Sequence, residues 1–111
     1  MKARIGAVLA VTVTMLGLMA VPAHAYGVEI TRVCDGKKTT YMAYTANNGD
    51  YAYTRKSGSS CAGHAWLRVK SGGKWGSWQH DPSKITIDPA KGIEVAHHKG
   101  CADCTVWITS P

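Results

Sequence analysis

The sequence contains no phenylalanine, and no long apolar run follows its first 25 residues. The four tryptophans and five tyrosines therefore have to supply the large aromatic side chains of the core. Without a second apolar run, the chain beyond residue 25 is not expected to span a membrane. Like charges form no block, whereas nucleic-acid-binding proteins of this size usually concentrate basic charge, so we expect no nucleic acid as a partner.

The first 25 residues have the pattern of an export signal. Lys2 and Arg4 give a basic start, an apolar run follows, and Ala23-His24-Ala25 is the small-x-small pattern after which signal peptidase cuts. We therefore expect residues 1–25 to be a signal peptide and residues 26–111 to form one secreted domain. That domain has eleven basic and seven acidic side chains, a formal charge of +4, which suits either an anionic partner or simple solubility.

All four cysteines lie in the predicted secreted domain. An even number of cysteines in a short exported chain predicts two disulfides. Three pairings are possible, and we favour Cys34–Cys61 with Cys101–Cys104 because the second two are close neighbours in the chain.

Short segments rich in Val, Ile, Thr, Tyr and Trp alternate with Gly, Asn, Asp and Pro, and no segment beyond residue 25 has a helical period. This pattern predicts an all-β fold, a small antiparallel sandwich or barrel stabilised by two disulfides. The predicted strands are 27–34, 38–45, 51–55, 64–70, 75–80, 84–88, 92–97 and 104–109.

Alternation along these strands predicts which side chains point into the core. Four tyrosines are expected to line a hairpin, with Tyr51 and Tyr53 on one face. The predicted inward residues are Val28, Ile30, Ala65, Leu67, Val69, Ile85, Ile87, Ile93, Val95, Val106 and Ile108.

The same alternation places Trp66 on the outward side of its strand, in line with Arg68 and Lys70, and it places Trp107 outward as well. Exposed tryptophan beside arginine is typical of surfaces that bind a protein or a polysaccharide. The alternative is that Trp66 packs beneath the Arg68 stem, or that both faces of the sheet are covered.

Trp75 and Trp78 lie three residues apart beside a glycine-rich turn. On a continuous strand they would point to opposite sides. One of them could fill a pocket of a partner; alternatively, one plugs the core and the other caps the end of the sandwich. The candidate binding residues are therefore Trp66, Arg68, Trp75 and Trp107.

The segment before the last strand allows a metal site, with His98, Cys101 and Cys104 as ligands and His64 or His80 as the fourth. A structural zinc site normally has a second cysteine pair, and an oxidising compartment favours a disulfide. We therefore expect neither a metal nor a cofactor.

No Gly-x-Ser-x-Gly elbow or other catalytic motif is present, so we do not expect an enzyme. The favoured function is that of a secreted binding protein, for example an inhibitor of an extracellular hydrolase. One alternative is a cell-envelope or glycan-binding protein, or a basic antimicrobial. Another is a small secreted hydrolase, in which two histidines and a carboxylate would converge.

No motif identifies a family. In its general plan only, a small exported β protein with two bridges resembles the secreted bacterial α-amylase inhibitors and the apoproteins of enediyne antibiotics, and the run Trp66-Leu67-Arg68 is too short to add to this resemblance. This resemblance assigns a role to no residue.

Overall fold

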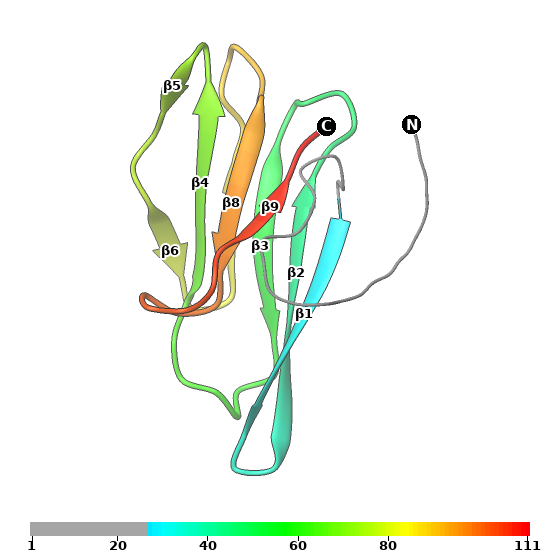
Figure 1. The fold of residues 1–111 in the computed structure, drawn as a ribbon, viewed down its shortest axis with the longest axis vertical. Helices are drawn as coiled ribbons and strands as arrows, with labels where there is room; N and C mark the ends of the chain where they lie inside the picture. Colours follow the sequence, from blue (N-terminus) through cyan, green and yellow to red (C-terminus); the bar gives the residue numbers. More distant parts are fainter. Residues whose placement is uncertain (1–26) are drawn as a thin grey trace.

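The computed structural model describes residues 27–111, so the predicted signal peptide and Tyr26 lie outside the described residues. The described chain forms two antiparallel sheets and contains no helix. Figure 1 shows the strands of the two sheets side by side, running close to vertical. The predicted all-β fold is confirmed, and two separate sheets make it a sandwich.

The first sheet has the strand order β1 (Gly27–Cys34), β2 (Lys37–Thr45), β3 (Ala52–Ser57) and β7 (Lys84–Ile87). The turn between β1 and β2 consists of Asp35 and Gly36, which both have positive φ, as a tight two-residue hairpin turn requires. Its outer side carries a group of aromatic and basic residues that we call the tyrosine face: Tyr44, Tyr51, Tyr53, Arg55 and Lys84.

The second sheet has the order β5 (Lys74–Trp75), β4 (Ala65–Ser71), β8 (Val95–Lys99) and β9 (Trp107–Thr109), and β6 (Gln79–Asp81) also pairs with β4. One continuous strand over 75–80 was expected. Instead, β5 and β6 pair with opposite ends of β4 and lie one above the other in Figure 1. Between them, the Gly76 amide donates to the Val69 carbonyl at 2.9 Å.

The core between the sheets confirms most of the predicted inward positions. One cluster contains Ala52, Leu67, Val69, Ile93 and Ala96, against which Ile85 and Ile87 pack. A second cluster contains Ile30, Tyr41 and Ala43, against which Val28 and Trp107 pack. Tyr41 is fully buried and so does not join the other tyrosines on the outer side, whereas Tyr51 and Tyr53 stack on one face, as predicted.

Of the inward positions predicted for the last two strands, Ile93 is confirmed, whereas Val95 and Ile108 are wrong. Ala96 and His98 are the buried residues of β8, which puts Val95 on the outer side. Because His98 pairs with Trp107 in the register of β8 and β9, Trp107 also points inward and Ile108 outward. The apolar run of residues 106–108 fits either side, and contact of the large indole with the second cluster decides between them.

A buried polar network connects the two sheets. The Thr54 hydroxyl of β3 donates to the Trp66 carbonyl at 2.9 Å, and this bond uses its only hydrogen. The Thr54 oxygen therefore accepts a hydrogen bond from Nδ1–H of His98 at 2.8 Å. In a neutral ring the other nitrogen carries no hydrogen, so Nε2 of His98 accepts a hydrogen bond from the Thr109 hydroxyl at 2.7 Å. Thr109 in turn lies 2.6 Å from the Thr45 hydroxyl. Burial lowers the pKa of His98 to about 3, so the ring is neutral at neutral pH.

Both predicted disulfides, Cys34–Cys61 and Cys101–Cys104, are present. The loops that contain them meet, because a Cβ on Gly63 would lie only 2.7 Å from Cβ of Cys101. The Tyr41 hydroxyl donates to the Gly100 carbonyl at 3.0 Å, and its ring leaves no room for a Cβ on that glycine. The end of the sandwich that contains both disulfides, which the chain reaches directly after β8, is therefore closely packed.

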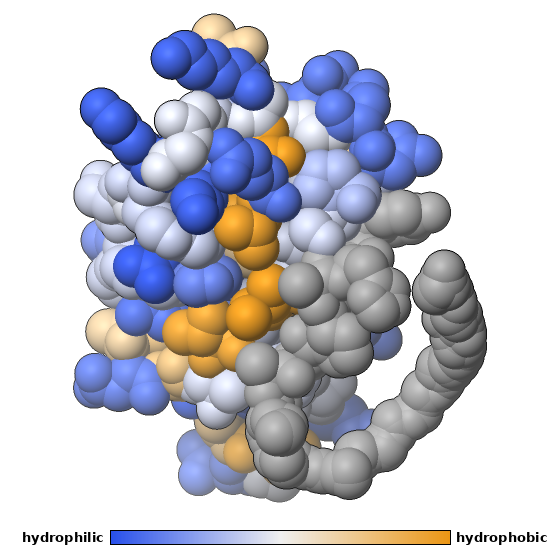
Figure 2. Space-filling model, turned by 45° about the horizontal axis from the view of Figure 1, so that its top comes forward, coloured by the Kyte–Doolittle hydropathy of each residue, from blue (hydrophilic) through white to orange (hydrophobic). Residues whose placement is uncertain are grey.

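Apolar surface gathers in a strip through the middle of the molecule in the view of Figure 2, with hydrophilic residues on its left and, in the upper part of the view, on its right. Within residues 27–111, no helix is present that could cross a membrane.

Candidate functional site

The outer side of the second sheet gathers aromatic and basic side chains from four strands. The register pairs Trp66 with Lys99 and Arg68 with His97, and alternation puts all four on the side opposite Leu67 and His98. Segments 74–75 and 78–81 add three more rings to this side. We call the whole group the tryptophan face: Trp66, Arg68, Trp75, Trp78, His80, His97 and Lys99.

Arg68 lies near the middle of the tryptophan face. Its guanidinium carbon is 4.8 Å from the centre of the Trp75 ring and 4.7 Å from that of Trp78. Its Nε and Nη2 face Nδ1 of His97 at 3.2 and 3.0 Å. Cation–π contacts at these distances are attractive, and they fix the guanidinium between neutral rings.

Lys99 is the second cation of the face. Its Nζ is 4.2 Å from the centre of the Trp78 ring and 5.1 Å from that of Trp66, and it donates to the Ala102 carbonyl at 2.7 Å. Trp66 also stacks on His80, with 4.0 Å between the ring centres. Trp78 thus contacts both cations and connects the two halves of the face.

His97 is a neutral member of the face. Burial lowers its pKa, and the nearby positive charge of Arg68 lowers that pKa further. A neutral ring can accept the hydrogen bond from Arg68, and the ring also contacts Trp75 at 4.2 Å between centres. All of these partners of Arg68 and Lys99 are therefore uncharged.

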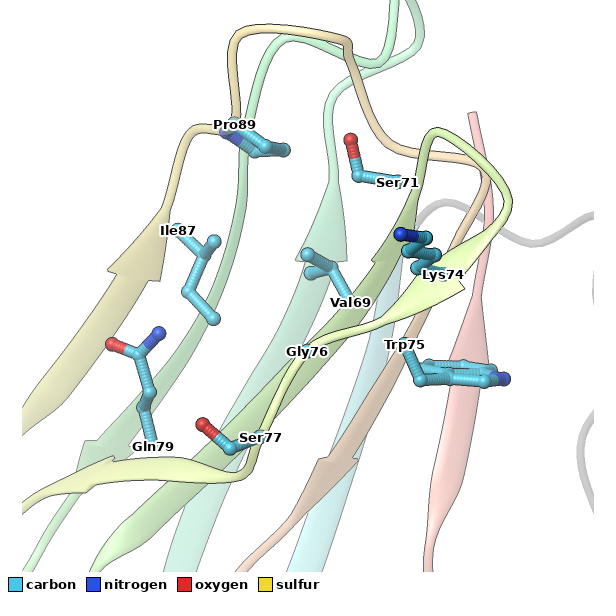
Figure 3. Close-up of a pocket in the computed structure, with 9 residues that line it drawn as sticks. All are labelled: Val69, Ser71, Lys74, Trp75, Gly76, Ser77, Gln79, Ile87 and Pro89. Atoms are coloured by element: carbon cyan, nitrogen blue, oxygen red, sulfur yellow. The ribbon is translucent and has the colours of Figure 1, made fainter.

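A groove of about 300 Å³ meets the tryptophan face at Trp75. It lies between β4, the β5–β6 connection and β7. Figure 3 shows Ile87 and Val69 on one side of Trp75, whose indole extends away from Ile87 toward β8. The apolar residues Val69, Ile87 and Pro89 line the groove, and so do Ser71, Ser77 and Gln79.

Two histidines meet at the edge of the face, near the carboxylate of Asp81. Nδ1 of His64 lies 2.9 Å from Nδ1 of His80. The neighbouring Asp81 carboxylate accepts hydrogen bonds from the backbone amides of Ser83 and Lys84, and these bonds lower its pKa. Asp81 is thus used to hold its own turn.

The alternative metal site is not assembled. The sulfur atoms of Cys101 and Cys104 are bonded to each other, and both ring nitrogens of His98 bond to threonines in the interior. Among residues 27–111, no other cluster of three histidine, cysteine or carboxylate side chains has the arrangement of a metal site.

Three of the four candidate binding residues, Trp66, Arg68 and Trp75, lie together on the tryptophan face. Trp107 does not, because it packs against the second core cluster. The sequence pattern did not predict the other four residues of the face as binding residues: Trp78, His80, His97 and Lys99. Gly76 was the available signal for Trp78, since a glycine inside a strand pattern often marks a break or a bulge.

No protein-family model matches this chain, and neither a curated protein nor a solved structure matches it.

Proposed function

We propose that this protein is a secreted, disulfide-stabilised binding protein that acts through the tryptophan face, as an inhibitor of an extracellular hydrolase. The observation that carries the proposal is the gathering of three indole rings and two cations on one outer side of a sheet. Tryptophan and arginine are the residues most enriched at binding hot spots. A side chain arrangement of this kind contributes little to a core, and it suits contact with another molecule.

The scaffold supports a rigid interface. Arg68 and His97 lie on adjacent central strands, and the Cys101–Cys104 disulfide follows closely after Lys99. Each ring of the face packs against a neighbouring ring or cation, so its side chain is already ordered before binding. Prior ordering reduces the entropy that is lost on docking.

Secretion is supported by two features. The first 25 residues have the pattern of a signal peptide, and the described domain is closed by two disulfides with no free cysteine among residues 27–111. Disulfides of this kind form and persist in oxidising compartments.

The arrangement favours a protein partner over a neutral glycan. A sugar ring would stack on the open face of an indole. Here the Trp66 ring is in contact with His80 and Lys99. The Trp78 ring is in contact with Arg68 and Lys99. The Trp75 ring is in contact with Arg68 and His97. Each of the three indoles therefore already has a cation or an imidazole against it within the protein, which leaves less ring area for a sugar.

The proposal is tested with protein expressed from the full 111-residue chain and titrated against a panel of secreted proteases and glycosidases. We expect inhibition of at least one enzyme at micromolar concentration or below. Trp75→Ala should weaken that inhibition by about tenfold or more, as loss of a hot-spot residue does.

Tyr51→Ala is the matched control, because Tyr51 is 39% exposed on the tyrosine face and Trp75 is 40% exposed on the tryptophan face. It should change inhibition by less than about twofold. Absence of inhibition across the panel at micromolar concentration would contradict the proposal, and so would equal losses for the two variants.

A further inference from the structure

The tryptophan face contains positive charge and no negative charge. The central strands of this face are β4 and β8. Along each of them, buried residues alternate with outward ones, and the register pairs the outward residues of one strand with those of the other. None of them is Asp or Glu, and three are basic. These positions are Trp66, Arg68 and Lys70 on β4, and Val95, His97 and Lys99 on β8.

Both central cations keep hydrogen-bond donors available for a ligand. The contacts of Arg68 with His97 involve Nε and Nη2, so the two N–H groups of Nη1 are free of that contact. Lys99 has three donors and directs a bond to the Ala102 carbonyl. A carboxylate reaching either cation would form a charge-assisted hydrogen bond, which is about twice as strong as a bond between neutral groups.

The indole rings present their edges to the same ligand. An aromatic ring is negative on its face and positive at its edge. Cations and imidazoles already lie against Trp66, Trp75 and Trp78, and the ring edges and indole N–H groups of these residues are the parts that attract an anion. Edges, N–H groups and cations all favour negative charge.

We propose that the partner docks on the tryptophan face through an acidic segment of a protein chain, with aspartate or glutamate carboxylates reaching Arg68 and Lys99. This inference rests on the proposed function, since it names the chemistry of the surface that the same face recognises. The groove beside Trp75 favours a polypeptide over a simple polyanion, because an uncharged side chain next to the acidic segment can enter it where Trp75 and Ile87 line it.

The test is isothermal titration calorimetry of the full chain with a synthetic peptide of alternating glutamate and leucine, with the glutamine–leucine peptide as the neutral control. We expect the acidic peptide to bind and the neutral one not to bind. The double variant Arg68→Gln/Lys99→Gln should weaken binding by about tenfold or more.

The matched control is Arg55→Gln/Lys84→Gln, which removes one arginine and one lysine from the tyrosine face and so changes the net charge equally. It should weaken binding by less than about twofold. Equal losses for the two double variants would overturn the proposal, because they would show attraction by net charge alone. If circular dichroism shows that the first double variant is unfolded, Lys99→Gln alone takes its place.

Dextran sulfate is the second probe. Tighter binding of dextran sulfate than of the acidic peptide, with the same loss in Arg68→Gln/Lys99→Gln, would overturn the assignment to a protein segment. If the peptide does not bind but an enzyme of the panel is inhibited through Trp75, the acidic-segment inference fails and the proposed function stands. If both are absent, both fail.

Discussion

The inner and outer sides of the second sheet are built from alternate residues of the same strands, yet they satisfy polar groups in opposite ways. On the inner side of β8, His98 is fully buried and both ring nitrogens bond to threonine hydroxyls. On the outer side, Arg68 and Lys99 contact indoles, an imidazole and a backbone carbonyl. The inner side closes its interactions within the molecule, whereas on the outer side the positive charges of Arg68 and Lys99 lie against uncharged groups.

This difference separates two kinds of residue. Substitutions on the inner side are expected to change the free energy of unfolding, because they leave buried groups without partners or create cavities. Substitutions on the tryptophan face are expected to change binding and to leave the fold intact. The tyrosine face, with one lysine over a ring and a similar exposure of its aromatic residues, is the internal control.

The largest expected effect is the loss of stability in acid through His98. Its pKa is about 3 in the folded protein and about 6.5 in the unfolded chain, so the unfolded state takes up the proton first as the pH falls. The stability contributed by the neutral ring is therefore complete above pH 6.5 and is lost progressively down to about pH 3. Denaturant unfolding should show a loss of about 3 kcal/mol from this group between pH 7 and pH 4.

The variants His98→Asn and His64→Gln identify the group responsible. Asparagine keeps a donor and an acceptor but does not titrate, so His98→Asn should unfold with a much smaller difference between pH 7 and pH 4. His64→Gln alters an exposed pair and should retain the dependence of the unmodified protein. An unchanged acid dependence in His98→Asn would show that the inner network is not what acid breaks.

The next effect is a difference of about 2 kcal/mol between two tryptophans that lie on opposite sides of the same sheet. Trp107→Ala removes a ring that packs against Ile30, Tyr41 and Ala43, and should lower the free energy of unfolding by about 3 kcal/mol. Trp75→Ala removes a ring from the outer side and should lower it by about 1 kcal/mol or less. Equal losses in denaturant unfolding at neutral pH would remove the distinction between the two sides.

Much of the fold could be predicted from local sequence pattern. Alternation through residues 64–70 gives both the buried and the outward positions of β4, and four cysteines in a short chain with the pattern of an export signal predict two disulfides. The side on which Trp107 lies could not be predicted, since the apolar run 106–108 satisfies either orientation. Contact with Ile30 and Tyr41, far away in sequence, decides it.

The residues of the tryptophan face were also predictable only where a local sequence pattern determines their side of the strand. Trp66 and Arg68 follow from the alternation of a single strand. Lys99 joins them only through the register of β8 against β4, which is a long-range property that no local pattern reveals. Trp78 joins them because the strand is interrupted after Trp75, which brings two rings expected on opposite sides to the same guanidinium.

The most direct test of the tryptophan face as a binding surface uses the four indole N–H signals in a ¹H–¹⁵N NMR spectrum. On addition of an inhibited enzyme or of the glutamate–leucine peptide, the signals of Trp66, Trp75 and Trp78 should shift or broaden. The signal of Trp107, which packs against the core, should stay in place. Shifts confined to Trp107, or equal shifts of all four signals, would contradict the account.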